Sequence, residues 1–387
     1  MKEIVPELLF DEAYQKRIEQ RLYAMAVEKS AMGRKIVGLY CAFTPKEIVA
    51  AAHAIPVSLC AGSEDPFPAA EAHLPVNLCP LIKSSYGHAV ADTCPYFHMA
   101  DFLLADATCD GKKKMFELLS RIKPLHMLLL PQSAVANDSL SSWEKELHRA
   151  VAFLEEMTGA SITRENLQKE IKRYNRLRHT IEKVYLLNAG DIPRVFGSEL
   201  DLITSMGGFE CDIDTRIIEM ESAISQINGR ALSTSFLHHM KKRPRILLTG
   251  CPTTNKKVLY LIEKMGGVVV AMETCGGLKS NGRPVKEEDD PIHALAEKYL
   301  SIACACMSPN TARVELIEDL IKTYRVDGVI ELTWSACHTY NVEAFQVQEA
   351  VRERFHKPYL QILTDYSPND MGQLETRIEA FLEIVAQ

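Results

Sequence analysis

The sequence predicts an α/β protein with two parallel-sheet domains that are joined by a helical segment. Short apolar runs rich in β-branched residues alternate with helical patterns in the first and last thirds of the chain, as in βαβ units. In the middle third these strand signals fade, and long amphipathic helices take their place. The length of 387 residues allows two or three domains, each with its own hydrophobic core.

The first α/β domain is expected over residues 35–140, after an N-terminal helical segment over residues 1–34. Residues 11–30 combine helical periodicity with many charges, which indicates an amphipathic helix. Helices are also expected at residues 44–55, which begin with Thr-Pro, and at residues 110–122. The apolar runs that we interpret as parallel strands are 35–43, 56–61, 101–109 and 126–131.

A helical insert or bridge is expected over residues 141–242, and a second α/β domain over residues 243–387. The stretches of the insert with clear helical periodicity are 141–159, 165–188 and 213–229. The candidate strands of the second domain are 245–250, 268–275, 327–337 and 358–366. Each of these strands is followed or preceded by a helix, which again favours a parallel sheet.

Charge and hydropathy exclude two classes of partner. The net charge is −7, and the basic residues are scattered except at Lys112–Lys114, so we expect no nucleic-acid-binding surface. The N-terminus is acidic and has no cationic segment before an apolar run, and no stretch of about 18 apolar residues occurs. We therefore expect a cytoplasmic protein that does not enter a membrane.

Nucleotide-binding motifs are missing from the sequence. It contains no G-x-x-x-x-G-K-S/T phosphate loop, and no G-x-G-x-x-G follows a strand. Any ATP hydrolysis must therefore be supplied by another protein. Cys337-His338 resembles a nucleophile–base pair, but adjacent residues on a strand point to opposite faces, which disfavours a thiol-protease mechanism.

Eleven cysteines are many for a reducing compartment, where structural disulfides are rare. Surplus thiols there often serve metals or redox chemistry, although a buried cysteine can also be a small hydrophobic residue. The placement of the cysteines favours the first interpretation. Random burial would spread them through strand centres, whereas here six of them stand at the carboxyl ends of candidate strands: Cys41, Cys60, Cys109, Cys251, Cys275 and Cys337. Because ligands gather at that edge of a parallel sheet, two edges that face each other would bring these thiols into one cleft.

The spacing of the cysteines requires a site that the tertiary fold assembles. Cys79, Cys94 and Cys109 are separated by fourteen residues each, which suits neither a zinc ribbon nor the C-x-x-C-x-x-C run of ferredoxins. Cys109 precedes a predicted helix that carries Lys112–Lys114, and Cys79 precedes Pro80 and a helix with Lys83. A helix N-terminus and nearby lysines stabilise a thiolate and an anionic cluster, although the lysines could equally form a solvated helix face.

Cys304 and Cys306 form a C-x-C pair. If this segment is extended, the two side chains point to opposite faces, so we expect only one of them to bind metal.

Several segments resemble the 2-hydroxyacyl-CoA dehydratase/benzoyl-CoA reductase family over nearly the whole chain. They are GLYCAFTPKEIVAAAHAIPVSLC, NLCPLIKSSYG, TCPYFHMADFLLADATCDGKKKMFELL, the CHTY at Cys337 and TDYSPNDMGQLETRIEAF. The resemblance is closest to the homodimeric branch, the double-cubane cluster proteins. It implies two Rossmann-like domains around an iron–sulfur cluster, and a separate dimeric ATP-hydrolysing activator that carries its own 4Fe–4S cluster and delivers electrons at very low potential.

The family also implies which cysteines bind the cluster. In the dehydratase subunits three cysteines hold a 4Fe–4S cluster, and by motif these correspond to Cys79, Cys109 and Cys337. The open iron position there binds the thioester carbonyl of the substrate and permits a ketyl radical. The double-cubane branch joins two such units into an 8Fe–9S cluster and needs more thiols, which this chain has in Cys41, Cys94, Cys275, Cys304 and Cys306.

For the second half of a double cubane we favour Cys41, Cys275 and one residue of the C-x-C pair, with Cys304 as the representative. Cys94 follows an apparent helix and is a weaker candidate, Cys60 and Cys251 remain alternatives, and Cys211 is expected to be structural.

Three functions are compatible with this sequence. The first is an oxygen-sensitive, homodimeric, ATP-dependent reductase that acts on small molecules at a double-cubane cluster. The second is the 4Fe–4S subunit of a 2-hydroxyacyl-CoA dehydratase, and the third is a cluster carrier or electron relay without substrate chemistry. About eight irons per chain would support the first function, and about four the second.

Overall fold

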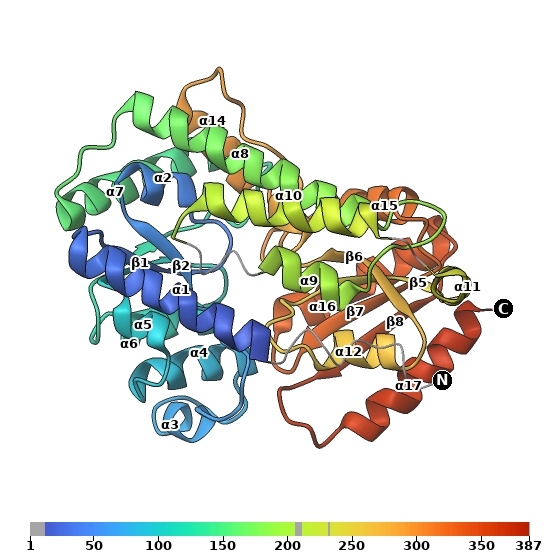
Figure 1. The fold of residues 1–387 in the computed structure, drawn as a ribbon. Helices are drawn as coiled ribbons and strands as arrows, with labels where there is room; N and C mark the ends of the chain where they lie inside the picture. The colour runs from blue at the N-terminus through green and yellow to red at the C-terminus, as the bar shows by residue number, and fades with distance from the viewer. Residues whose placement is uncertain (1–11, 206–210, 231–232, 387) are drawn as a thin grey trace.

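Two parallel four-stranded sheets form the framework of the molecule (Figure 1). The computed structural model describes residues 12–205, 211–230 and 233–386. The first sheet has the order β2-β1-β3-β4, with bounds Ile55–Ser58, Ile36–Tyr40, Phe102–Asp106 and Leu125–Leu128. The second has the order β6-β5-β7-β8, with bounds Val268–Glu273, Arg245–Gly250, Gly328–Trp334 and Tyr359–Thr364. The predicted α/β fold with two Rossmann-like units and a helical bridge is therefore confirmed.

The central strands owe their apolar character to cover on both faces. Every residue of β1, β3, β5 and β7 is buried, as expected for parallel strands between two layers of helices. The strands are shorter than the sequence predicted at their carboxyl ends. The predicted strand 101–109 ends at Asp106, whose carboxylate accepts hydrogen bonds from the backbone N–H of Phe43 and Thr44. The residues beyond Asp106 are thus released into a loop at the edge of the sheet.

Six helices accompany the first sheet. Their bounds are Glu12–Ala31 (α1), Lys46–Ala51 (α2), Phe67–Glu71 (α3), Pro80–Val90 (α4), Pro95–Met99 (α5) and Asp110–Leu119 (α6). The helix predicted at 44–55 is shortened at both ends, because Pro45 caps it at the start and residues from Ile55 on belong to β2.

The helical bridge is present between the two sheets. Its helices are Ser139–Thr158 (α7), Arg164–Leu186 (α8), Gly197–Ser205 (α9), Ile213–Gly229 (α10) and Thr234–Lys241 (α11). In Figure 1, α8 and α10 run along the top of the molecule across the region between the sheets. Gly159 ends α7 in a left-handed conformation with φ +73°, and Thr163 caps α8 through the N–H of Asn166. The exact domain boundaries at residues 34, 140 and 242 stay a prediction.

Helices of the second half complete the fold. They are Lys257–Lys264 (α12), Leu278–Asn281 (α13), Pro291–Leu300 (α14), Thr311–Thr323 (α15), His338–Glu349 (α16) with a π-helical turn at Ala350–Arg354, and Met371–Val385 (α17). Although it is distant in sequence, α14 packs against α7 and α8 of the bridge (Figure 1). Among the residues that the structure describes, no helix is both long and apolar enough to cross a membrane.

A buried ion pair ties the three parts of the chain together. Glu47 of α2 is paired with Arg178 of α8, and both side chains are almost fully buried. The second carboxylate oxygen of Glu47 accepts a hydrogen bond of 2.8 Å from the Tyr299 hydroxyl at the end of α14. Burial alone would raise the pKa of Glu47, but the adjacent guanidinium lowers it below its ordinary value. The first sheet, the bridge and the second half therefore meet at one charged contact.

Breaking this pair from one side should destabilise the fold strongly. We expect Glu47→Gln and Arg178→Met each to cost about 3–5 kcal/mol, because each leaves a buried partner without its counterpart. The double variant should cost less than the sum of the two single changes. Urea unfolding followed by circular dichroism measures the effect. Lys322→Ala, which breaks an exposed pair with Glu318, is the control and should leave the midpoint nearly unchanged. Additive single effects would show that the pair has no structural role.

Candidate functional site

The strand-end cysteines lie where the sequence placed them. Cys41 directly follows β1 and Cys251 directly follows β5. The others come two or three residues after their strands: Cys60, Cys109, Cys275 and Cys337. Both sheets reverse their strand order beside the first strand, between β1 and β3 and between β5 and β7. Crevices at such switch points are the usual ligand sites of open parallel sheets.

Helix N-termini hold the three cysteines that the family motif singles out. Cys79, Cys109 and Cys337 are the N-cap residues of α4, α6 and α16. The backbone N–H groups of Leu81 and Ile82 donate to the Cys79 thiol, and that of Tyr340 donates to the Cys337 thiol. Free N–H groups and the positive end of a helix dipole stabilise a thiolate at this position.

Gly111 explains why α4 and α6 can begin side by side. A Cβ atom at Gly111 would lie 2.7 Å from Cδ1 of Ile82, which is closer than real side chains approach. Glycine at this position lets the first turns of the two helices, and hence Cys79 and Cys109, come close together. The glycine of the Cys-Asp-Gly motif therefore has a packing role.

The carboxyl edges of the two sheets contact each other directly. A Cβ atom at Gly62, after β2, would lie 2.3 Å from the backbone oxygen of Thr254, after β5. The side chain of Asn255 donates to the backbone oxygen of Gly62 at 3.1 Å. At another point Gln132, after β4, donates to the Thr108 oxygen and accepts from the N–H of Ser308. The strand-end loops of both halves thus form one interface.

A first group of thiols, which we call the first cysteine group, consists of Cys79, Cys251 and Cys337. A hydrogen bond with Cys251 lowers the pKa of Cys337 to about 7, and it adds to burial in raising the pKa of Cys251. Burial, together with the charge of Cys337, raises the pKa of Cys79 to about 12. Cys79 and Cys337 come from different sheets, as predicted.

Cys109 acts on this region through Lys112, whose charge it stabilises. That Cys79, Cys109 and Cys337 bind one cluster stays a prediction.

A second group, the second cysteine group, consists of Cys41, Cys275, Cys304 and Cys306. Burial raises the pKa of Cys41 to about 11 and that of Cys275 to about 12, with the neighbouring thiolates adding to the effect. A hydrogen bond from Cys306 lowers the pKa of Cys304 to about 5 and raises that of Cys306. Cys41 comes from the first sheet and the other three from the second half.

The C-x-C pair is not extended, which corrects one expectation. The Cys304 N–H donates to the oxygen of Ile302, and the N–H of Met307 donates to the oxygen of Cys304, so the segment is a turn. In a turn the two thiols face each other instead of pointing to opposite faces. The argument that only one of them can reach a metal therefore does not apply to this conformation.

Lys112 is the lysine of the three-residue cluster that faces the thiols. Its ammonium lies 2.7 Å from the Cys41 sulfur. Burial would lower the pKa of Lys112, but the thiolates of Cys41, Cys60 and Cys109 raise it well above its ordinary value. Cys41 adopts an unusual left-handed conformation with φ +76°. This conformation costs a non-glycine residue roughly 1–2 kcal/mol and is stabilised by contacts such as the one to Lys112.

The other predicted lysines have different roles. Lys83 is buried, but its ammonium bonds to the Glu71 carboxylate and to the Val76 oxygen, both at 2.9 Å. Lys113 and Lys114 are exposed and pair with acidic residues of their own helix, Asp110 and Glu117. The expectation of a lysine group at the site therefore holds for Lys112, whereas Lys113 and Lys114 form a solvated helix face.

Two predicted alternatives are less closely involved. The Cys94 sulfur accepts the N–H of Phe97 at 3.4 Å and so serves as the N-cap of α5. Cys60 lies close enough to Tyr40 and Lys112 to influence the pKa of each. Neither observation tests whether these thiols bind a metal.

Sequence reasoning missed Lys279 and Tyr340. The ammonium of Lys279 is fully buried and lies 2.6 Å from the Tyr340 hydroxyl, which in turn lies 3.8 Å from the Cys304 sulfur. A signal was present, since Cys275-Gly-Gly-Leu-Lys279 places a lysine shortly after a strand-end cysteine and a glycine, much as Cys109-Asp-Gly-Lys112 does.

The donor atoms fit a cysteine-ligated iron–sulfur cluster better than a single metal ion. Within the described ranges, no three His, Cys, Asp or Glu side chains converge as a mononuclear site requires. In an iron–sulfur cluster each thiolate binds a different iron, so the sulfurs can be spread out. The two buried groups of thiols, with lysine ammonium groups and helix N-termini beside them, have this arrangement and this charge.

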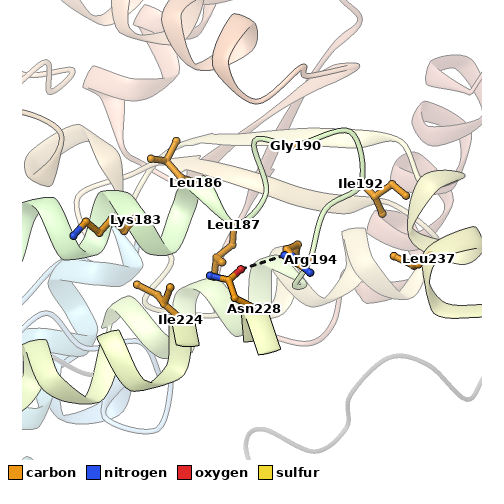
Figure 2. Close-up of a pocket in the computed structure, with 9 residues that line it drawn as sticks. All are labelled: Lys183, Leu186, Leu187, Gly190, Ile192, Arg194, Ile224, Asn228 and Leu237. Atoms are coloured by element: carbon orange, nitrogen blue, oxygen red, sulfur yellow. Dashed lines mark hydrogen bonds between the residues drawn. The ribbon is translucent and has the colours of Figure 1, made fainter. Parts of the chain in front are cut away.

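Two surface cavities lie apart from the cysteine groups. One of about 570 Å³ is formed by α8, α10, α11 and the loop after α8, and Figure 2 shows Arg194 hydrogen-bonded to Asn228 across it. Another of about 310 Å³ follows β7 and β8 and is lined mainly by polar residues, among them Ser335, Asp365 and Asp370. Neither cavity is lined by a cysteine.

Comparisons with known proteins agree with this picture. The profile of the family described as 2-hydroxyglutaryl-CoA dehydratase, D-component, matches residues 41–385. YjiM of Escherichia coli (strain K12), which has a provisional name as a dehydratase subunit, is 38% identical over 97% of this chain and 98% of its own length. The (R)-phenyllactyl-CoA dehydratase beta subunit of Clostridium sporogenes is 21% identical over 91% and 92%. A benzoyl-CoA reductase subunit of Thauera aromatica is 24% identical over 51% and 45%. The matched region includes every candidate cysteine.

The contact at Gly62 offers a test of the site that leaves every thiol in place. Gly62→Ala should lower the iron bound per chain after anaerobic reconstitution, because the added methyl group would collide with a backbone oxygen and push the two sheet edges apart. Gly372→Ala is the matched control, since a Cβ atom there meets nothing within 4 Å. Iron is quantified by a chelator assay and the fold by circular dichroism. Equal iron in both variants would show that the interface does not position the thiols.

Proposed function

Because the chain belongs to the 2-hydroxyglutaryl-CoA dehydratase D-component family, we propose that it is an iron–sulfur reductase whose double-cubane 8Fe–9S cluster lies between the two sheets. A separate ATP-hydrolysing activator with its own 4Fe–4S cluster would supply low-potential electrons, which the chain, as a homodimer, would use to reduce small molecules.

The presence of two thiol groups is the observation that carries this proposal. One 4Fe–4S unit held by three cysteines would be satisfied by Cys79, Cys109 and Cys337. The structure has a further buried group, in which Cys41, Cys275 and Cys304 influence one another's pKa. A one-cluster subunit has no use for this second group, whereas a double cubane requires it.

The residues around the thiols would prepare the site for an anionic cluster. When bound, such a cluster supplies one-electron transfer at low potential. The N–H groups at the starts of α4 and α16 and the ammonium of Lys112 offset negative charge, and burial keeps water away. The sequence has no phosphate loop, so ATP would be hydrolysed by the partner.

A dehydratase subunit is the second candidate, and the relatives favour it. Both full-length relatives have dehydratase names, and the matched family is named as one component of such an enzyme. In this alternative the chain would hold one 4Fe–4S cluster, pair with another subunit and eliminate water from a 2-hydroxyacyl-CoA through a ketyl radical.

Counting iron in cysteine variants separates these candidates. We expect about eight irons per chain in the wild type. Cys109→Ser and Cys275→Ser should each lose a large part of them, since they remove ligands from different halves. Cys211→Ser should keep the full content and serves as the control. About four irons, lost with Cys109→Ser and unaffected by Cys275→Ser, would instead support the dehydratase subunit.

The source of electrons is tested by turnover under strict anaerobiosis. Reduction of a small acceptor should require both the activator and ATP, because the low end of the potential range, near −700 mV for clusters in general, is out of reach of mild donors. The matched arm replaces the activator with a chemical reductant at the same potential. Equal rates in both arms would contradict activator-gated electron delivery. Dehydration of a 2-hydroxyacyl-CoA without net reduction would favour the second candidate, and no turnover of either kind would favour an electron relay.

A further inference from the structure

Lys279 is a buried cation that the proposed function does not account for. Its side chain is fully buried at the start of α13, beyond the end of β6. The ammonium lies 3.0 Å from the Glu273 carboxylate, 2.6 Å from the Tyr340 hydroxyl and 3.3 Å from the backbone oxygen of Gly250. Burial would lower the pKa of Lys279, but the Glu273 carboxylate raises it, so the side chain stays charged.

Tyr340 connects this cation to both thiol groups. Its hydroxyl lies between the Lys279 ammonium and the Cys304 sulfur, at 2.6 and 3.8 Å. Its backbone N–H donates to the Cys337 thiol. The aromatic ring lies between two cations, with the Lys279 ammonium 4.6 Å and the Arg313 guanidinium 4.9 Å from its centroid. The side chain is thus fixed and has no freedom to turn away from Cys304.

Nearby acids do not cancel the effect of Lys279 on the thiols, because each has other partners on the side away from them. Glu273 also bonds to Thr249 and Arg313. Glu331 bonds to Arg313 and Tyr359, and Glu343 bonds to Arg313 and Asn310. Of this network, Lys279 is the member whose charge acts on Cys275 and Cys304.

The two thiol groups therefore differ in the cations that contact them. The second cysteine group has Lys112 bonded to Cys41 and Lys279 linked to Cys304 through the Tyr340 hydroxyl. The first cysteine group has helix N–H groups but no lysine hydrogen-bonded to its sulfurs among the contacts of the described residues. A positive charge beside a cluster favours its reduced form, since that form carries one more negative charge.

We propose that the Lys279–Tyr340 pair makes the half of the site at Cys41, Cys275 and Cys304 the one that accepts the first electron. In this step one electron passes from a one-electron donor, such as the reduced cluster of the activator, to that half, and no bond is made or broken. The inference rests on the proposed double-cubane site and assigns an order to its reduction. Lys279 and Tyr340 act through the thiols and are positioning residues.

A redox titration followed by electron paramagnetic resonance tests this order. The first reduction step should carry the signal that changes in Cys275→Ser. In Lys279→Met that step should become harder by at least about tenfold in its equilibrium constant, which corresponds to about 59 mV for one electron, while the other step stays in place. Lys279→Arg, which retains the charge, should restore the wild-type titration.

Two further variants keep the outcome clear. Tyr340→Phe removes one oxygen and keeps the ring, so it should fold even if Lys279→Met does not, and it should shift the same step in the same direction. Lys83→Met removes a buried lysine that is neutralised by Glu71 and should leave the Cys275-associated step unchanged.

Failure of the inference differs from failure of the proposed function. A wild-type chain that binds about four irons or none would refute the double-cubane site itself. Full iron content with both steps unmoved, or both moved equally, in Lys279→Met and Tyr340→Phe would overturn the proposed order and leave the site intact.

Discussion

The arrangement of the site depends on one buried hydrogen-bonded ion pair. Glu47 stands six residues after Cys41, and Tyr299 stands five residues before Cys304, so their hydrogen bond of 2.8 Å fixes two cysteine loops from opposite halves of the chain. Arg178 of the bridge helix α8 supplies the charge that lets Glu47 stay ionised in a buried position. A carboxylate buried without that cation would be strongly unfavourable, which makes the bridge a structural requirement for the site.

Burial of so many thiols imposes a second constraint. Away from water an uncompensated thiolate is unfavourable, and the pKa values of Cys41, Cys79 and Cys275 are raised accordingly. The fold opposes this with helix N-termini at Cys79 and Cys337 and with ammonium groups on Lys112 and Lys279. Such compensation has no evident purpose around inert core cysteines, but it suits thiols that must carry charge when they hold the proposed cluster.

The equal strand order of the two sheets gives the site its approximate symmetry. Each sheet places cysteines at its switch point, and the two edges are in contact through Gly62 and Thr254. The charges around the two thiol groups do not share this symmetry, because Lys279 and Tyr340 belong to the second half only. A nearly symmetric scaffold with unequal charges can give two similar metal units different potentials, which is the physical basis of the proposed order of reduction.

The sequence by itself determined the two α/β units, the helical bridge, the strand-end cysteines and the helix starts at Cys79 and Cys109, because these follow from local periodicity and from residues adjacent in the chain. Only the tertiary structure decided which thiols meet. The contacts Cys251–Cys337 and Lys279–Tyr340 join residues far apart in sequence, and no local pattern encodes them. The turn at the C-x-C pair and the Lys83–Glu71 pair were also beyond local reasoning, since both depend on neighbours that the fold supplies.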